Sequence, residues 1–160
     1  MDRAPPELTF RLDNLTNPRI AEFLSEHLAD MRAVSPPESV HALDLDGLRQ
    51  PTIQFWSAWT DDGQTLAGTG ALRRIDSAHG EIKSMRTAAN LRGRGVAGAI
   101  LAHLLGQARV NGWQRVSLET GSQPFFAPAR ALYARHGFTA CPPFEGYIDD
   151  PHSHFMTLYL

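Results

Sequence analysis

Arg92-Gly93-Arg94-Gly95-Val96-Ala97-Gly98 lies between a strand-like run, 81–87, and a helical run that begins near Val96. Glycines let a bulky ligand approach the main chain closely, and the first turn of a helix offers unpaired N–H groups to an anion. Two arginines within three residues add positive charge and forked donors for phosphate oxygens. We therefore predict that this segment binds the diphosphate of a nucleotide ligand.

A dinucleotide-binding fingerprint is one interpretation of the same residues. Gly93, Gly95 and Gly98 have the spacing Gly-x-Gly-x-x-Gly, and Glu119 stands about 20 residues further on, where a ribose-binding acid is expected. After Glu119 only 41 residues remain, whereas a doubly wound domain requires further βα units. No Gly-Lys-Ser/Thr follows the turn, so the segment is not the phosphate-binding P-loop (Walker A motif) of a nucleoside triphosphatase. An NAD-binding oxidoreductase is therefore the hypothesis that we rank last.

The periodicity of apolar residues predicts the order of the elements. Runs typical of strands are 8–12, 53–60, 65–75, 81–87, 115–120 and 155–160, and runs typical of helices are 20–34, 96–110 and 128–136. Asp61-Asp62-Gly63 predicts a hairpin turn, and 76–80 predicts another, so that three consecutive strands form an antiparallel meander. The segment 39–48 is acidic and mixed, and we expect a short helix there. A helix joining 81–87 to 115–120 would make these two strands parallel.

Residues 92–97 can also be read as Arg-x-x-Gly-x-Ala. This pattern resembles the acyl-coenzyme A signature of the GCN5-related N-acetyltransferase (GNAT) superfamily. Residues 129–138 resemble the second signature of that family, a helix that carries a tyrosine and is closed by Gly-Phe. Three further segments look like a bacterial subgroup of the family, some members of which are labelled indole-acetate acetyltransferases: 83–87, 117–122 and 126–130.

The resemblance implies a fold and a co-substrate. The fold is α/β (α+β), with a mixed, mostly antiparallel central sheet, one splayed parallel strand pair and flanking helices. The co-substrate is acetyl-CoA, whose pantetheine arm bonds to main-chain groups beside a bulge in the first parallel strand; no metal is implied. Many members carry an asparagine seven residues before the tyrosine, where this chain has Phe126, whose ring could pack on the arm. The residues assigned to acetyl-CoA are Met85, Arg86, Thr87, Arg92, Gly93, Arg94, Gly95, Val96, Ala97, Gly98 and Phe126.

Transfer of an acyl group to an amine requires a proton acceptor and a proton donor. An alkylammonium has a pKa of about 10 and must lose a proton before it attacks, while a departing thiolate, with a pKa of about 8.5, must gain one. Glu81 is our candidate base, because it stands eleven residues before Arg92, as the base of histone-acetylating members does. Glu119 or a water chain is the alternative. Tyr133 resembles the tyrosine of the family and is our candidate acid, although Glu81 and Tyr133 could each be purely structural.

Composition narrows the remaining possibilities. A chain of 160 residues suits one domain, 1–160. The single Cys141 forms no intramolecular disulfide, and no apolar leader or run of eighteen apolar residues is present, so we expect a cytoplasmic protein without membrane partners. A net charge of −2 without a basic block disfavours nucleic acid as a partner. We expect a small-molecule acceptor, and the sequence is compatible with either a monomer or a homodimer.

We therefore expect an N-acetyltransferase that moves an acetyl group directly from acetyl-CoA to a small-molecule acceptor, an amine in our hypothesis. Cys141 follows the Gly-Phe segment, where a strand should lead away from the thioester, so an acyl-enzyme is disfavoured. The alternative from another class is a catalytically silent acyl-CoA-binding sensor, which would use the same cleft without chemistry.

Overall fold

The computed structural model describes residues 6–60 and 63–160. The strands are β1 (Leu8–Leu12), β2 (Ile53–Thr60), β3 (Leu66–Arg74), β4 (His79–Thr87), β5 (Arg115–Gly121), β6 (Thr139–Ala140) and β7 (Ser153–Tyr159). The α-helices are α1 (Pro18–Val34), α2 (Leu45–Leu48), α3 (Val96–Val110) and α4 (Ala127–Arg135), and short 3₁₀ helices occupy Pro37–Ser39, Ala89–Leu91 and Pro124–Phe126. None of the helices in these described ranges has both the length and the apolar content needed to cross a bilayer.

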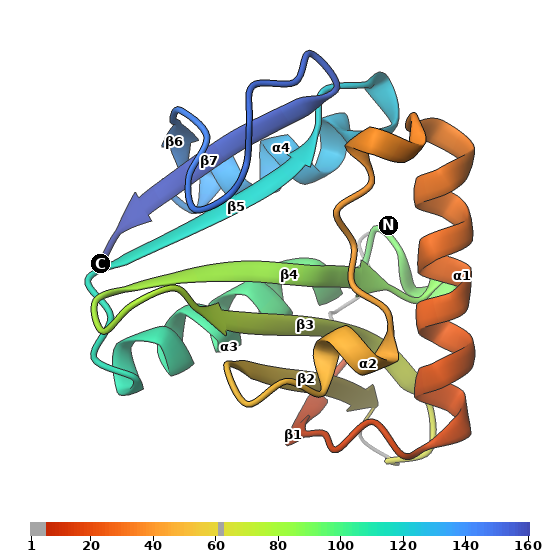
Figure 1. Ribbon diagram of the computed structural model, residues 1–160. Coiled ribbons are helices and arrows are strands. Elements are labelled where there is room, and N and C mark those ends of the chain that lie inside the picture. The colour runs from red at the N-terminus through yellow and green to blue at the C-terminus, as the bar shows by residue number, and fades with distance from the viewer. Residues whose placement is uncertain (1–5, 61–62) are drawn as a thin grey trace.

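The strands form one seven-stranded sheet in the order β1-β2-β3-β4-β5-β7-β6 (Figure 1). Every neighbouring pair is antiparallel except β4 and β5, which are parallel and joined by α3. This arrangement confirms the predicted fold class and the predicted β2-β3-β4 meander. A sheet with one parallel pair is not a doubly wound dinucleotide fold, so the last-ranked hypothesis loses its structural basis.

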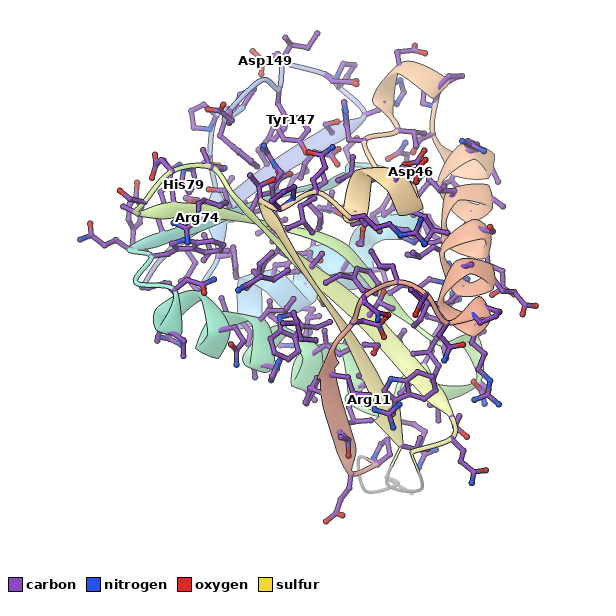
Figure 2. All side chains as sticks on the ribbon, turned by 60° about the horizontal axis from the view of Figure 1, so that its bottom comes forward. Arg11, Asp46, Arg74, His79, Tyr147 and Asp149 are labelled. Atoms are coloured by element: carbon purple, nitrogen blue, oxygen red, sulfur yellow. The ribbon has the colours of Figure 1, made fainter. Side chains whose placement is uncertain are left out.

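Two hydrophobic clusters cover the two faces of the sheet. Successive side chains of a strand point to opposite faces, and along β2 Phe55 belongs to one cluster whereas Trp56 packs against the other. The larger cluster lies under α3 and α4, and the smaller one lies under α1 and α2. Figure 2 shows Arg11 on the edge strand β1, on the opposite side of the molecule from Tyr147. Helices thus cover both faces of the sheet.

A bulge in β4 parts it from β5. Thr69 lies opposite Arg86 and Ala71 opposite Lys83, so two steps along β3 match three along β4. Ser84, inside the extra segment, has a φ of 56°, and its carbonyl accepts a hydrogen bond from the Thr69 hydroxyl at 2.8 Å. Parallel pairing with β5 runs from His79 only as far as Ile82, and Figure 1 shows the two ribbons diverging. The predicted bulge and the predicted splayed pair are therefore both present.

The predicted element boundaries agree with most observed ones. The Asn17 side chain accepts from the Arg19 N–H at 2.9 Å and caps α1, which ends at Val34 before the prolines. In the segment 39–48 only Leu45–Leu48 is α-helical. The predicted turn residues Asp61 and Asp62 lie outside the described residues. The short strand β6 lies where a strand was expected to follow the Gly-Phe segment, although two residues carry no periodicity from which its bounds could be predicted.

Candidate active site

The loop before α3 leaves the first turn of that helix free for an anion. Gly93 and Gly95 have φ values of 75° and 82°, a region that residues with a side chain rarely adopt. Gly95 is the N-cap of α3, and no side chain caps the helix there. Its carbonyl accepts from the Ala99 N–H at 3.1 Å, so α3 begins its hydrogen-bonded ladder at once. The first turn of α3 thus has no side-chain cap and lines the cleft described below, which suits a phosphate site.

A cleft of about 620 Å³ runs past this loop. It is bounded by the parted ends of β4 and β5, by α4, and by the segment 35–42 after α1. Tyr133 and Glu81, the predicted catalytic residues, both line it. Arg94 does not, and its Nε lies buried without a hydrogen-bond partner among the described residues. The other residues predicted for acetyl-CoA all line the cleft: Met85, Arg86, Thr87, Arg92, Gly93, Gly95, Val96, Ala97, Gly98 and Phe126.

Beyond Ile82, β4 offers the cleft its main-chain groups, while the Arg86 side chain points elsewhere. Beyond Ile82 this strand has no partner on its β5 side. The Arg86 side chain turns toward α1, where its Nη1 donates to Asp30 Oδ2 at 2.6 Å and its guanidinium lies over the Phe23 ring. Arg86 can therefore meet a ligand in the cleft through its backbone, in the way that an added strand would bond.

Tyr133 and Phe126 form the wall of the cleft on the α4 side. The Tyr133 ring is buried and packs edge-on against Phe138, with centroids 5.8 Å apart. Burial, and secondarily the charge of Glu119, hold the pKa of Tyr133 well above its usual range, so the hydroxyl keeps its proton. Phe126 fills the space beside Gly121, where an added Cβ would lie 2.0 Å from the ring. Glycine at 121 is thus what allows Phe126 to reach the cleft.

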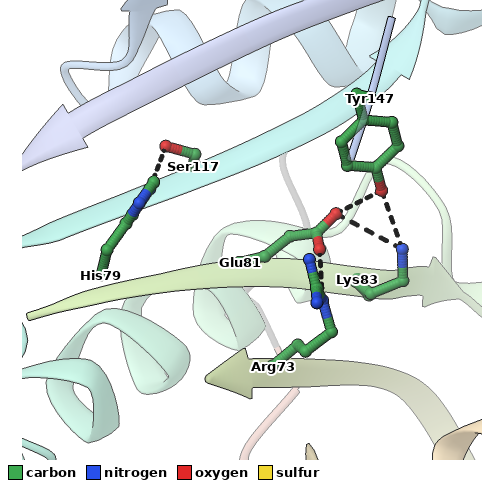
Figure 3. A network of polar contacts seen from close by, with 6 residues as sticks. All are labelled: Arg73, His79, Glu81, Lys83, Ser117 and Tyr147. Carbon is green, nitrogen blue, oxygen red and sulfur yellow. Dashed lines mark hydrogen bonds and ion pairs between the residues drawn. The ribbon is translucent and has the colours of Figure 1, made fainter. Parts of the chain in front are cut away.

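Glu81 is the centre of a buried polar cluster (Figure 3). Its carboxylate is 1% exposed, and its Oε1 accepts from Arg73 Nε at 2.8 Å. Its Oε2 accepts from Lys83 Nζ at 3.3 Å and from the Tyr147 hydroxyl at 2.5 Å. Lys83 also donates to the Tyr147 oxygen at 3.0 Å. Because three donors already occupy the Glu81 oxygens, a proton taken from an acceptor would have to displace one of them.

Glu119 lies at the point where β5 leaves β4, and it lines the same cleft. Burial raises the pKa of Glu119 to about 7; the charge of Glu81 adds to this rise, while Ser153 and Lys83 act against it. In the part of the chain that the structure describes, no cation lies within ion-pair distance of its carboxylate. A carboxyl group that changes charge near neutral pH can both take and release a proton. Of the two acids, Glu119 is the one whose oxygens are less engaged.

A cover lies over the mouth of the cleft, made of the segment 35–42 after α1 and the loop 142–152 before β7. The Ser39 hydroxyl donates to Asp150 Oδ2 at 2.5 Å, and His41 packs edge-on against the Tyr147 ring at 5.0 Å. Gln123 Nε2 donates to Ser35 Oγ at 3.1 Å. Parts of the chain more than a hundred residues apart are thus joined beside the cleft.

Sequence reasoning missed Tyr147, Arg73 and Lys83 as members of the site. Lys83 follows Glu81 by two residues on one strand, so their side chains share a face, and this signal was readable. Arg73 lies directly opposite Glu81 in the β3–β4 register, which only the structure fixes. Tyr147 belongs to a loop without periodicity, and nothing in the sequence placed it beside residues 66 positions earlier.

The chain is similar in sequence and in fold to known acetyltransferases. The family model described as Acetyltransferase (GNAT) family matches residues 20–138. The chain is 51% identical over 147 residues to the uncharacterized N-acetyltransferase YsnE of Bacillus subtilis, covering 92% of this chain and 96% of that protein. It is 34% identical over 139 residues to the IAA acetyltransferase of Azospirillum brasilense, covering 86% of each. A solved Bacillus subtilis acetyltransferase in complex with CoA shares the fold, with a TM-score of 0.67, 19% identity and coverage of 96% and 99%.

Proposed function

The chain belongs to the GNAT family of acetyltransferases and is an acyltransferase, and we propose that it moves an acetyl group directly from acetyl-CoA to a small-molecule amine. The observation that carries this proposal is the parting of β4 from β5 beyond Ile82, with the phosphate-type loop at one end of the gap and Tyr133 beside it. A sensor without chemistry has no observation in its favour, since a polar cluster and two acids line the same cleft.

The loop 92–98 and the free edge of β4 are the proposed holders of acetyl-CoA. The N–H groups of the first turn of α3, with Arg92 at the cleft wall, suit the diphosphate. The main chain of Met85 to Thr87 suits the pantetheine arm. N–H groups at the bulge can also stabilise the oxyanion that forms on the carbonyl, a contribution of about 2–4 kcal/mol, or roughly a hundred- to a thousandfold in rate. The complex of a Bacillus subtilis relative with CoA supports this assignment.

Proton transfer completes the proposed reaction. The amine nitrogen forms a bond to the thioester carbonyl carbon, the carbon–sulfur bond breaks, and the thiolate leaves. Tyr133 is the proposed donor of a proton to that thiolate; because burial raises the pKa of its hydroxyl, the phenolate left behind takes a proton back at once, from solvent or from the carboxyl group that accepted the amine proton. Glu81, the base predicted from the sequence, and Glu119 are the two proposals for the group that takes the proton of the amine. Glu119 is favoured because it forms no ion pair among the described residues, whereas Glu81 accepts from Arg73, Lys83 and Tyr147.

Two measurements test the proposal on the full chain. Calorimetry with acetyl-CoA should show saturable binding, and release of the free thiol should depend on an added amine. The acceptor panel includes the IAA after which the Azospirillum brasilense relative is named. If acetyl-CoA binds saturably but no amine causes release of the free thiol, the proposed transfer is overturned. If acetyl-CoA does not bind at millimolar concentration, the proposed cofactor site is overturned.

A further inference from the structure

A second cavity, of about 310 Å³, adjoins the main cleft. The two share four lining residues, namely His41, Glu81, Lys83 and Tyr147. The rest of the second cavity is lined by Leu43, Gln50, Ile53, Arg73, Glu145 and Gly146. A molecule that reached from one cavity into the other would therefore pass the polar cluster around Glu81.

That cluster carries more positive than negative charge. Two cations, Arg73 and Lys83, share the single carboxylate of Glu81. The Lys83 side chain is 9% exposed and the Arg73 side chain 27%. A cation taken out of water is costly unless an anion compensates it, and one carboxylate compensates one cation. Arg73, Lys83 and Glu81 together therefore carry a net charge of +1 at the border of the two cavities.

The donors that remain are suitably placed for an anion. Arg73 donates to Glu81 through its Nε, and its two terminal guanidinium nitrogens are not used in that hydrogen bond. Lys83 uses two of its three N–H bonds, for Glu81 and for Tyr147. A guanidinium edge beside an ammonium group is a strong site for a carboxylate.

The neighbouring titratable groups do not cancel this charge at neutral pH. Burial, and secondarily Lys83, lower the pKa of His41, so this ring is neutral and offers one donor. Glu119 faces Lys83 as well, but burial raises its pKa to about 7 and so reduces its mean negative charge. Glu145 is an exposed residue at the rim of the second cavity and forms no ion pair with Arg73 or Lys83.

Given the proposed transfer to an amine, on which this inference rests, we propose that the acceptor also carries a carboxylate, which Arg73 and Lys83 bind in the second cavity. The amine of the acceptor then lies in the main cleft near Glu119, and its carbon chain passes His41 and Tyr147, which line both cavities. The substrate class is an amino acid or another amine that bears a carboxylate at a distance.

Matched acceptors test this proposal. We would measure KM and kcat, by thiol release, for ω-amino acids and for their primary amides, which differ in the anionic group alone. Charged hydrogen bonds of this kind correspond to a factor of about 10 to 100, so KM should be lower for the acid by that factor. Arg73→Gln and Lys83→Met should each remove most of this preference, and Lys83→Arg should keep part of it. A preference that survives both substitutions would overturn the proposal.

Arg74→Gln is the matched control. Arg74 neighbours Arg73 in the sequence, but its guanidinium lies over the Trp113 ring at 5.8 Å and does not line either cavity. Figure 2 shows it beside His79, away from Tyr147. This variant removes one positive charge from the molecule without touching the cluster, so the ratio of KM values for acid and amide should stay at the wild-type value.

A binding measurement separates this inference from the proposed function. Lys83 is the only lysine of the chain, so growth on lysine labelled with ¹³C at Cε alone gives one side-chain NMR signal and needs no substitution. With CoA present, 4-aminobutyrate should shift that signal saturably, and its amide should not. A saturable shift without turnover of any amine would keep the carboxylate site and overturn the transfer. Turnover that is equal for acid and amide, with no shift, would overturn the carboxylate site alone.

Discussion

Tyr133 is a buried side chain whose surroundings keep its hydroxyl protonated. Its burial disfavours the phenolate, so the hydroxyl is a donor over the whole range of ordinary pH. If it protonates the leaving thiolate, Tyr133→Phe should lower kcat about a hundredfold while the Kd for acetyl-CoA stays unchanged. Stopped-flow thiol release and calorimetry give the two numbers.

The control for this variant is Tyr159→Phe. Tyr159 lies on β7 with its ring exposed, under the Arg115 guanidinium, and it does not line the cleft. Its substitution should leave kcat unaltered. If Tyr133→Phe also turned over at the wild-type rate, the tyrosine would be a packing residue only.

Glu119 leads to a pH prediction. Because burial raises its pKa to about 7, the basic carboxylate form grows as the pH rises through 7. As the base, Glu119 should give kcat/KM a rising limb with a midpoint near pH 7, and Glu119→Gln should abolish that limb and lower the plateau about a hundredfold. A pH–rate profile from pH 5 to 9 checks this. A limb that persists in Glu119→Gln would transfer the role to Glu81 or to water.

The same pKa shift makes a prediction about stability. The folded state binds the Glu119 proton more tightly than the unfolded chain does, so the stability conferred by the protonated form is fully present below about pH 4 and is lost as the pH rises through about 7. Relative to wild type, Glu119→Gln should gain about 1–3 kcal/mol in the free energy of unfolding above pH 7. Urea denaturation at pH 4 and pH 8 measures the difference, which should vanish at the lower pH.

Among the elements, α3 is preceded by a glycine at its N-cap, Gly95, and contains another in its interior, Gly106. Gly95, with a φ of 82°, starts the helix, so Gly95→Ala should cost about 1–2 kcal/mol of stability and weaken acetyl-CoA binding, because the loop must shift. Gly106 lies inside the helix, where an added Cβ meets nothing within 4 Å. Gly106→Ala should gain up to about 1 kcal/mol and leave the Kd unchanged. Thermal melts measure the stability of both variants, and calorimetry measures their Kd for acetyl-CoA. If the two variants bound acetyl-CoA with equal Kd values, the loop before α3 would have no role in binding it.

How far sequence reasoning reached also depends on the element. The α1 and α3 helices and the β2 and β3 strands follow from caps, prolines and periodicity, which are local signals. The bulge in β4 has no local signal, since nothing about Ser84 requires a positive φ; it was expected through the family resemblance alone. The second cavity was out of reach because its walls come from the segment 41–53, two strands and a loop that meet only in the folded chain.

At the scale of the whole molecule, the cover over the cleft joins the first and last thirds of the chain. The Ser39–Asp150 hydrogen bond is its most direct link. Ser39→Ala should loosen the cover and raise KM for the acceptor about two- to tenfold, with the Kd for acetyl-CoA unchanged, because one hydrogen bond of this kind is lost. Ser25→Ala, at an exposed position of α1, is the control and should have no effect. An acceptor KM that stays constant in Ser39→Ala would mean that the cover does not contact the acceptor.

The chain carries fourteen arginines but a single lysine, and that lysine is hydrogen-bonded between Glu81 and Tyr147. A guanidinium is not acylated by thioesters under mild conditions, and an ammonium held by a carboxylate has no lone pair to attack with. The side-chain amine is thereby protected from acylation: prolonged incubation with excess acetyl-CoA should leave Lys83 unmodified.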